Sequence, residues 1–223
     1  MRLKCRPAAL IFDMDGLLLD TEPLAALAWR DTAIGLGVEF DAALALALVG
    51  RNFADCATMI RAHYGADYPV DEVLDRWHAT YDAIVEREGV AVKPGVHELL
   101  DWLERKAIPR AIATSTGRER ARGKLIRTAL LPRFHELVGG DEVAFGKPSP
   151  DIYFEAARRL AMAASDCVVL EDSEPGIRAA LAAGMIPIMV PDLHPPPAGL
   201  RAIDLIVLPT LHDVLRHLQE LPS

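Results

Sequence analysis

The sequence predicts an α/β protein in which a parallel sheet core carries an inserted four-helix domain. Residues 22–89 show helical periodicity almost throughout, while the rest of the chain alternates short apolar runs with amphipathic stretches. Strands that alternate with helices are typical of parallel sheets whose crossovers are helical. The length of 223 residues suits a core of about 150 residues plus an insertion.

The first strand is the apolar run 8–12, and the inserted helices follow it. Apolar residues recur there at helical spacing, most clearly where Val73, Trp77 and Tyr81 share one face. The four predicted helices cover residues 22–35, 41–48, 52–64 and 71–88, with Asn52 as a candidate N-cap. Short loops between these helices predict a small bundle.

The alternation of helices and strands begins after Gly89. The predicted strands are 108–113, 136–139, 167–170, 186–190 and 205–208. The predicted helices are 96–106, 118–129, 151–162, 174–183 and 211–221. Ligands of such sheets bind at the carboxyl ends of the strands. The residues just beyond each strand are therefore the candidates for a functional site.

Composition and charge narrow the class of protein. Apolar residues make up 51% of the chain and charged residues 25%, which is the balance of an ordinary folded protein. The net charge of -8 argues against a nucleic-acid or anionic-membrane partner. No apolar run is long enough for a secretion signal or a membrane span, so we expect a cytoplasmic protein.

Two smaller groups of residues are predicted to be structural. Cys5, Cys56 and Cys167 are isolated, so we expect reduced cysteines that fill the core. A basic run shares its helix with Glu119 and is predicted to be a solvated face. The run consists of Arg118, Arg120, Arg122, Lys124 and Arg127.

Asp13 and Asp15 are the most informative pair in the chain. They follow the first apolar run and precede Gly16, so a loop that begins at Asp13 can turn both carboxylates toward one site. Two close carboxylates repel each other unless a metal or a shared proton intervenes. A solvated turn is the alternative interpretation of this short motif.

Further polar residues follow the other strands. Thr114 and Ser115 end one strand, Lys147 lies in the next connection, and Glu171-Asp172 ends the apolar run 168–170. Carboxylates are the ligands that Mg²⁺ prefers, while lysine and hydroxyl groups bind phosphate. Each residue also has a structural alternative, such as an N-cap role for Glu171-Asp172. Their joint occurrence in order favours a phosphate bridged to magnesium.

These motifs resemble the haloacid dehalogenase superfamily, in its helical-cap branch of phosphatases and phosphohexomutases. Within that branch the chain is similar to the beta-phosphoglucomutase and pseudouridine 5'-phosphatase groups. The four matching motifs are residues 13–23, Thr114, residues 146–151, and residues 171–173 with Gly176. The resemblance implies a Rossmann-like core of residues 1–19 and 92–223 and a cap of residues 20–91.

The resemblance also implies roles for the site residues. Asp13 is expected to be the nucleophile that forms an aspartyl-phosphate, and Asp15 the general acid and base. Thr114, Ser115 and Lys147 are expected to bind the phosphoryl group. The expected cofactor is Mg²⁺, held by Asp13, Asp15 through its main-chain carbonyl, Asp172, and Glu171 either directly or through water.

The substrate is expected to be a small phosphorylated metabolite, a sugar phosphate or a nucleotide-like compound. Candidate substrate contacts in and near the cap are Thr21, Glu22, Arg51 and Asn52. The mutases carry a histidine where this chain has Ala25 and an arginine where it has Phe53. We therefore predict hydrolysis, with a phosphohexomutase or a phosphate-binding non-enzyme as alternatives.

A phosphoacceptor signalling domain is a rival from another class. It predicts a shorter chain without a cap and without the second aspartate. Asp15 and the insertion both speak against it. The sequence gives no prediction of the oligomeric state.

Overall fold

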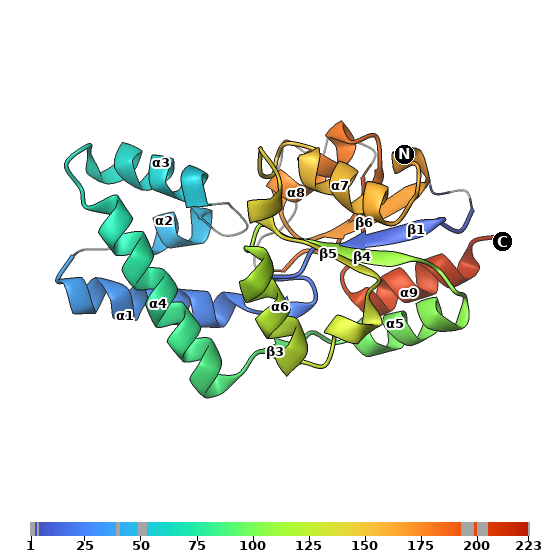
Figure 1. Cartoon of the computed structure of the whole chain (residues 1–223), viewed down its shortest axis with the longest axis horizontal. Helices are drawn as coiled ribbons and strands as arrows, with labels where there is room; N and C mark the ends of the chain where they lie inside the picture. The colour runs from blue at the N-terminus through green and yellow to red at the C-terminus, as the bar shows by residue number, and fades with distance from the viewer. Residues whose placement is uncertain are drawn as a thin grey trace.

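The core of the protein is a six-stranded parallel sheet (Figure 1). The computed structural model describes residues 3, 5–38, 41–48, 53–192, 199 and 205–222. The strand order is β5-β4-β1-β6-β7-β8. The strands are β1 (Ala9–Phe12), β4 (Arg110–Ala113), β5 (Glu136–Val138), β6 (Cys167–Glu171), β7 (Ile186–Met189) and β8 (Ile206–Val207). Strand β1 lies between β4 and β6, so later strands are added on both sides of it, and β1 marks the topological switch point of the sheet.

Helices cover both faces of this sheet (Figure 1). Side chains alternate along β1, so Leu10 and Phe12 face one layer while Ala9 and Ile11 face the other. The first layer contains α5 (Val96–Arg105), α6 (Arg118–Arg127) and α9 (Leu211–Glu220). The second layer contains α7 (Asp151–Arg159) and α8 (Glu174–Ala182). Burial on both faces explains why the central strands are continuously apolar.

The inserted segment forms a separate helical body beside the sheet (Figure 1). Its helices are α1 (Glu22–Leu36), α2 (Ala42–Ala47), α3 (Phe53–Tyr64) and α4 (Val70–Glu88). The segment has apolar clusters of its own, in which Trp29, Ile60 and Leu74 are buried. It therefore buries its apolar faces largely against itself and leaves one side toward the core.

The two chain crossings between this body and the sheet form a small antiparallel ribbon. Strand β2 (Leu19–Asp20) pairs with β3 (Ala91–Val92), with Leu19 opposite Val92 and Asp20 opposite Ala91. This ribbon was not predicted from the sequence, because a strand of two residues is too short to show the alternation of apolar and polar side chains. The domain boundaries at residues 19–20 and 91–92 remain a prediction.

The predicted fold class is confirmed, with an α/β Rossmann-like parallel sheet and an inserted helical cap. Short 3-10 turns at Leu131–Arg133, Gly140–Glu142 and Ala164–Asp166 were not predicted. The described residues include no helix that is long and apolar enough to cross a membrane. Cys167 is buried as expected, but Cys5 is exposed, so the core-filling prediction is wrong for that residue.

Candidate active site

The predicted site residues meet in one cleft between the cap and the carboxyl edge of the sheet. Asp13 follows β1 and Thr114 follows β4, and Asp172 follows β6, which pairs with β1 on its other side. Asp13, Asp15, Thr114, Ser115 and Asp172 line the cleft, whose volume is about 1410 Å³. The parallel topology brings together residues that are far apart in the sequence.

Lys147 is buried behind Asp13, outside the lining of the cleft, and connects two of the predicted carboxylates. Its ammonium group donates to Asp13 Oδ1 at 2.5 Å, to Glu171 Oε1 at 2.7 Å and to the carbonyl of Ala113 at 3.0 Å. The two carboxylates raise the pKa of Lys147 well above its usual value, although burial opposes this. Lys147 is therefore a fixed positive charge beside Asp13.

Glu171 is fully buried and anchored from several sides. Its carboxylate also accepts from the hydroxyl of Tyr153 at 3.2 Å and from the main chain and hydroxyl of Ser173, each at 2.8 Å. A Cβ atom at Gly176 would lie 1.7 Å from Glu171 Oε1, so only glycine fits there. In this arrangement Glu171 positions Lys147.

The N-cap alternative for Glu171-Asp172 is resolved by Ser173. Ser173 is the N-cap of α8, and its hydroxyl accepts from the main-chain N–H of Gly176 at 3.2 Å. The two carboxylates that precede Ser173 are therefore not needed to cap this helix.

Asp13 and Asp172 lie in an acidic environment that favours a bound cation. Burial, opposed by Lys147 and reinforced by Glu171, raises the pKa of Asp13 to about 7. Burial and repulsion from Glu171 and Asp13 raise the pKa of Asp172 well above its usual value. Asp172 Oδ2 would lie 2.4 Å from a Cβ atom at Gly16, so the loop backbone passes directly over this carboxylate. A divalent cation beside the two carboxylates would relieve their repulsion.

The available donors fit Mg²⁺. No group of three His, Cys, Asp or Glu side chains within the described part of the chain is arranged to hold a metal. Mg²⁺ commonly binds through one or two carboxylates and keeps several waters and substrate oxygens as its other ligands. Asp13, Asp172 and the main-chain carbonyl of Asp15 are such a donor set.

Asp15 lies in a different environment from Asp13. Its carboxylate accepts from Lys124 Nζ at 2.7 Å and from the hydroxyl of Thr116 at 2.7 Å. Burial opposes ionisation, but Lys124 and then Thr116 hold the pKa of Asp15 below its usual value. The two aspartates thus have opposite pKa shifts although they are two residues apart.

Lys124 corrects the prediction that the basic run is a solvated face. Its side chain is buried, and it lies on the same stripe of α6 as the buried residues Ala121 and Leu125. The i, i+3, i+4 spacing of these three residues was the signal in the sequence. Arg120, Arg122 and Arg127 are exposed as predicted, and Arg118 is half-buried.

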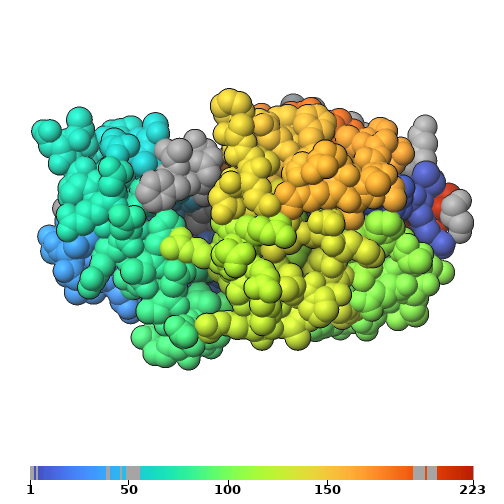
Figure 2. All heavy atoms as spheres, in the orientation of Figure 1, coloured from blue at the N-terminus to red at the C-terminus, as the bar shows by residue number. Residues whose placement is uncertain are grey.

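Helix α6 also connects the core to the cap. Arg120 pairs with Asp82 at 3.2 Å and Arg127 with Glu86 at 3.4 Å, both across to α4. Lys124 Nζ lies 4.8 Å from the ring centroid of Tyr81, which is also on α4. Figure 2 shows the green cap helix and the yellow-green part of the core in contact along this boundary.

Two hydroxyl groups at the end of β4 are suited to bind phosphate. Ser115 Oγ is buried, lines the cleft and has no hydrogen-bond partner among the described residues. Thr114 Oγ1 accepts from the main-chain N–H of Thr116 at 3.1 Å, which leaves its own proton for another acceptor. An anionic oxygen between these groups would satisfy both.

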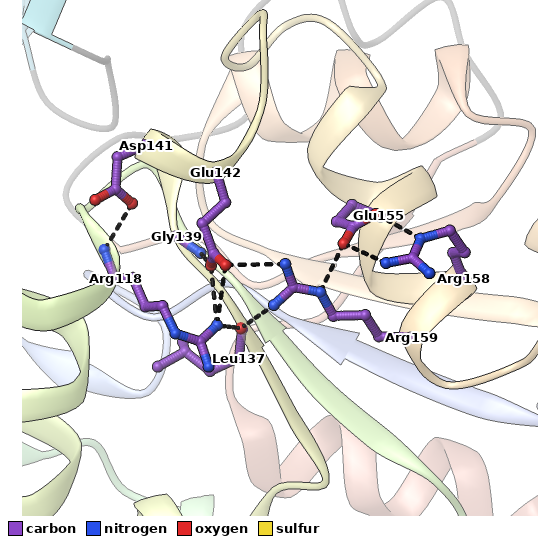
Figure 3. Close-up of polar contacts among 8 residues, drawn as sticks. All are labelled: Arg118, Leu137, Gly139, Asp141, Glu142, Glu155, Arg158 and Arg159. Atoms are coloured by element: carbon purple, nitrogen blue, oxygen red, sulfur yellow. Dashed lines mark hydrogen bonds and ion pairs between the residues drawn. The ribbon is translucent and has the colours of Figure 1, made fainter.

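A polar network holds the loop that follows β5 at the edge of the cleft (Figure 3). Glu142 accepts from the main chain of Gly139 at 2.9 Å, from Arg118 at 3.0 Å and from Arg159 at 2.9 Å. The main-chain N–H of Arg118 donates to Asp141 at 2.8 Å. These contacts join the start of α6, the loop and α7 into one rigid support.

The structure describes two of the four candidate substrate contacts in and near the cap. Thr21 and Glu22 are buried and line the cleft, and Thr21 Oγ1 has no hydrogen-bond partner within the described part of the chain. Burial and then the negative charges of Asp15 and Asp192 raise the pKa of Glu22 to about 7. Arg51 and Asn52 lie outside the described residues.

Comparisons with known proteins support the resemblance. The model of the haloacid dehalogenase-like hydrolase family matches residues 7–184. A bifunctional riboflavin kinase/FMN phosphatase of Arabidopsis thaliana is 33% identical over 192 residues, which cover 86% of this chain and 50% of that protein. The chain therefore spans about half the length of this relative.

Two bacterial proteins match over nearly their whole length. Beta-phosphoglucomutase of Bacillus subtilis (strain 168) is 31% identical over 218 residues, covering 95% of this chain and 94% of that protein. The structure of CbbY from Rhodobacter sphaeroides in complex with phosphate aligns with a TM-score of 0.79 at 29% identity, covering 96% and 99% of the two chains. This protein belongs to the haloacid dehalogenase-like hydrolase family.

Proposed function

We propose that this protein is a Mg²⁺-dependent phosphatase that hydrolyses a small phosphomonoester through an aspartyl-phosphate on Asp13. The observation that carries the proposal is that Asp13, Asp15, Asp172, Thr114 and Ser115 converge on one cleft, where Lys147 contacts Asp13 and Lys124 contacts Asp15. Two carboxylates in different environments are able to take different roles in one reaction. The phosphatase activity named for the Arabidopsis relative supports the same reaction class.

In the first step, an oxygen of Asp13 attacks phosphorus and the bond to the leaving alkoxide breaks. Lys147 donates to Asp13 Oδ1 at 2.5 Å and so positions the nucleophile; to bind a phosphoryl oxygen it would exchange one of its three hydrogen bonds. The hydroxyls of Thr114 and Ser115 donate to the other oxygens, where negative charge is spread in the transition state. Asp15 supplies the proton that the leaving alkoxide takes up.

In the second step, water attacks the phosphorus of the aspartyl-phosphate. Asp15 removes a proton from this water, the bond between phosphorus and Asp13 breaks, and inorganic phosphate leaves. The pairing of Asp15 with Lys124 and Thr116 suits this base role, because it keeps the carboxylate ionised.

Bound Mg²⁺, held by Asp13, Asp172 and the carbonyl of Asp15, would reduce the repulsion between the nucleophile and the anionic substrate. The raised pKa values of Asp13 and Asp172 fit this assignment. Glu171 is assigned to an outer position, because Lys147, Tyr153 and Ser173 already occupy its oxygens.

A phosphohexomutase is the alternative, and the Bacillus relative is named beta-phosphoglucomutase. A mutase has to hold a sugar bisphosphate in two orientations and keep water from the aspartyl-phosphate. Ala25 lines the cleft where the mutases carry a histidine, and its methyl group cannot donate or accept a hydrogen bond. We therefore favour hydrolysis over transfer.

Phosphate release from a panel of phosphomonoesters tests the proposal, with Mg²⁺ and with chelator. The Asp13→Asn variant should abolish Mg²⁺-dependent release, because an amide is a poor nucleophile. Arg122→Gln is a matched control, since this exposed residue lies outside the cleft. Release that survives in Asp13→Asn would overturn the assigned nucleophile. No release from any monoester, together with turnover of a hexose phosphate primed by a bisphosphate, would establish the mutase.

A further inference from the structure

The cap side of the cleft is an apolar and aromatic wall. Its described residues include Ala25, Trp29 and Ala33 on α1 and Trp77 and Tyr81 on α4. Residues 25, 29 and 33 are spaced by four, so they share one face of their helix. The wall continues directly from the catalytic aspartates, and a substrate bound through its phosphate would place its leaving group here.

Three aromatic rings run in sequence along this wall, of which Trp29 and Tyr81 are largely buried and reach the cleft with a small part of their surface. The Trp29 and Trp77 rings stack with centroids 5.0 Å apart, and the Trp77 and Tyr81 rings stack at 5.2 Å. Tyr81 also meets Lys124, which pairs with Asp15. The aromatic run therefore begins beside the group that would protonate the leaving alkoxide and extends away from it.

Apart from Thr21 and Glu22, which lie near Asp15, the polar groups of the wall are few, and several are already paired. Among the described lining residues, Arg30 pairs with Asp31 and Asp82 pairs with Arg120. Trp77 donates its indole N–H to the carbonyl of Ala25 at 3.4 Å. A polyhydroxylated leaving group would lose its hydrogen bonds to water here with little compensation.

Large apolar side chains are exposed on both sides of the cleft. Ile34 on the cap is 74% exposed, and Phe145 on the opposite, core side is 68% exposed, and both line the cleft. Exposed apolar residues that line a site are typical of a ligand-binding surface. A leaving group with apolar surface would be favoured in such a cleft.

Resting on the proposed phosphatase function, we infer that the leaving group of the substrate carries a planar aromatic or heteroaromatic ring. The ring lies against the wall of Trp29, Trp77 and Tyr81, with Phe145 closing on it from the core. The phosphate site recognises the phosphoester of the substrate, and the aromatic wall recognises the ring of its leaving group.

The test compares esters that differ only in the ring. FMN and ribitol 5-phosphate have the same phosphoester and differ by the isoalloxazine, and uridine 5'-monophosphate and ribose 5-phosphate differ by the base. The kcat/KM of the ring-bearing member should be higher by at least about tenfold in at least one pair. Equal values in both pairs, or higher values for the ringless members, would overturn the inference while leaving the phosphatase intact.

Phe145→Ser and Phe154→Ser are the matched variants. Phe154 is also exposed, at 46%, but it lies on α7 outside the cleft lining. Phe145→Ser should reduce the preference for the ring-bearing ester, and Phe154→Ser should leave it unchanged. Identical preferences in both variants would overturn the role of Phe145.

A binding measurement separates this inference from the proposed function. In the Asp13→Asn protein, FMN should bind more tightly than ribitol 5-phosphate, as measured by quenching of flavin fluorescence and by competition. If the wild-type protein hydrolyses nothing but this order holds, the phosphatase proposal fails and the ring site stands. Equal affinities would overturn the ring site whatever the activity.

Discussion

Asp15 and Lys124 form a partly buried ion pair, 2.7 Å between Oδ1 and Nζ, that joins the loop after β1 to helix α6. The pair keeps Asp15 ionised, yet the first chemical step asks Asp15 to deliver a proton. The approach of an anionic phosphoryl group would draw the ammonium of Lys124 toward itself and weaken its hold on Asp15. Lys124 is thus placed to affect both roles of Asp15.

Replacing Lys124 with Met should move the pH profile of the enzyme. Lys124 lowers the pKa of Asp15, so its removal raises that pKa. The kcat/KM for the first step falls when Asp15 loses its proton, and this basic-side fall should move to higher pH. Steady-state kinetics from pH 4 to pH 10 measures the shift: in the wild type the fall has already begun at the acid end of this range, whereas in the variant it should begin at higher pH. Arg122→Met on the exposed side of α6 is the control. An unmoved profile would contradict the coupling.

The same Lys124→Met change should also reduce stability. Asp15 would remain partly buried without its cation, at a cost of roughly 2 kcal/mol. For a chain of this length, that corresponds to a fall in Tm of about 4–8 °C. Differential scanning calorimetry at pH 7 measures this loss. Because the folded pKa of Asp15 is lowered in the wild type and raised in the variant, the difference between the two proteins should shrink as pH falls through these two pKa values.

Glu142→Gln should weaken the support of the loop after β5 in a pH-dependent way. The main-chain N–H of Gly139 and the guanidinium groups of Arg159 and Arg118 outweigh burial and lower the pKa of Glu142. Its stabilising effect is therefore complete above the unfolded pKa and is lost as pH falls through the folded value. We expect a loss of about 1 kcal/mol at pH 7 by urea unfolding and a smaller loss at pH 3. The control is Glu119→Gln, which changes an exposed residue of α6, and a loss that is equal at both pH values would contradict the mechanism.

Gly176→Ala and Gly123→Ala should have opposite effects although both glycines lie in helices. A Cβ atom at Gly176 would overlap Glu171, so the carboxylate and Lys147 would be displaced and activity should fall by at least about tenfold. A Cβ atom at Gly123 would meet no neighbouring atom within 4 Å, so alanine should stabilise α6 by up to about 1 kcal/mol. Thermal unfolding and phosphate release measure both effects. Full activity in Gly176→Ala would show that Glu171 does not position Lys147.

Cap movement is testable by a cross-link across the boundary. Asp82→Cys with Arg120→Cys, joined by a short bifunctional maleimide in a Cys5→Ser background, would fix α4 to α6. Turnover should slow by at least about tenfold, because substrate and product have to pass between cap and core. Asp101→Cys with Arg133→Cys, cross-linked inside the core and outside the cleft, is the control. Full turnover in the locked protein would reject cap opening as a required step.

Much of the architecture was predictable because its signals are local. The apolar run before Asp13 predicted β1, and the spacing of Val73, Trp77 and Tyr81 predicted a helix that the structure extends from Val70 to Glu88. Polar residues at strand ends converge because parallel strands share a carboxyl edge, so the order of the motifs predicted which residues meet.

The remaining features depend on distant parts of the chain. Lys124 was predicted to be solvated because its run is basic. Its spacing from Ala121 and Leu125 indicated a buried position, but its partner Asp15 is 109 residues away in the sequence. Tyr153 beneath Glu171 and the pairing of β2 with β3 likewise arise from tertiary contacts. No short-range pattern in the sequence carries such information.

The ribbon of β2 and β3 has a consequence for how this protein can change. Because Leu19 and Val92 are paired neighbours, the entire cap is, topologically, the loop of a β-hairpin. A hairpin loop can be lengthened, shortened or exchanged without altering the register of the strands that carry it. Evolution, or a protein engineer, can therefore replace the substrate-facing wall as a single cassette while the aspartates remain in place.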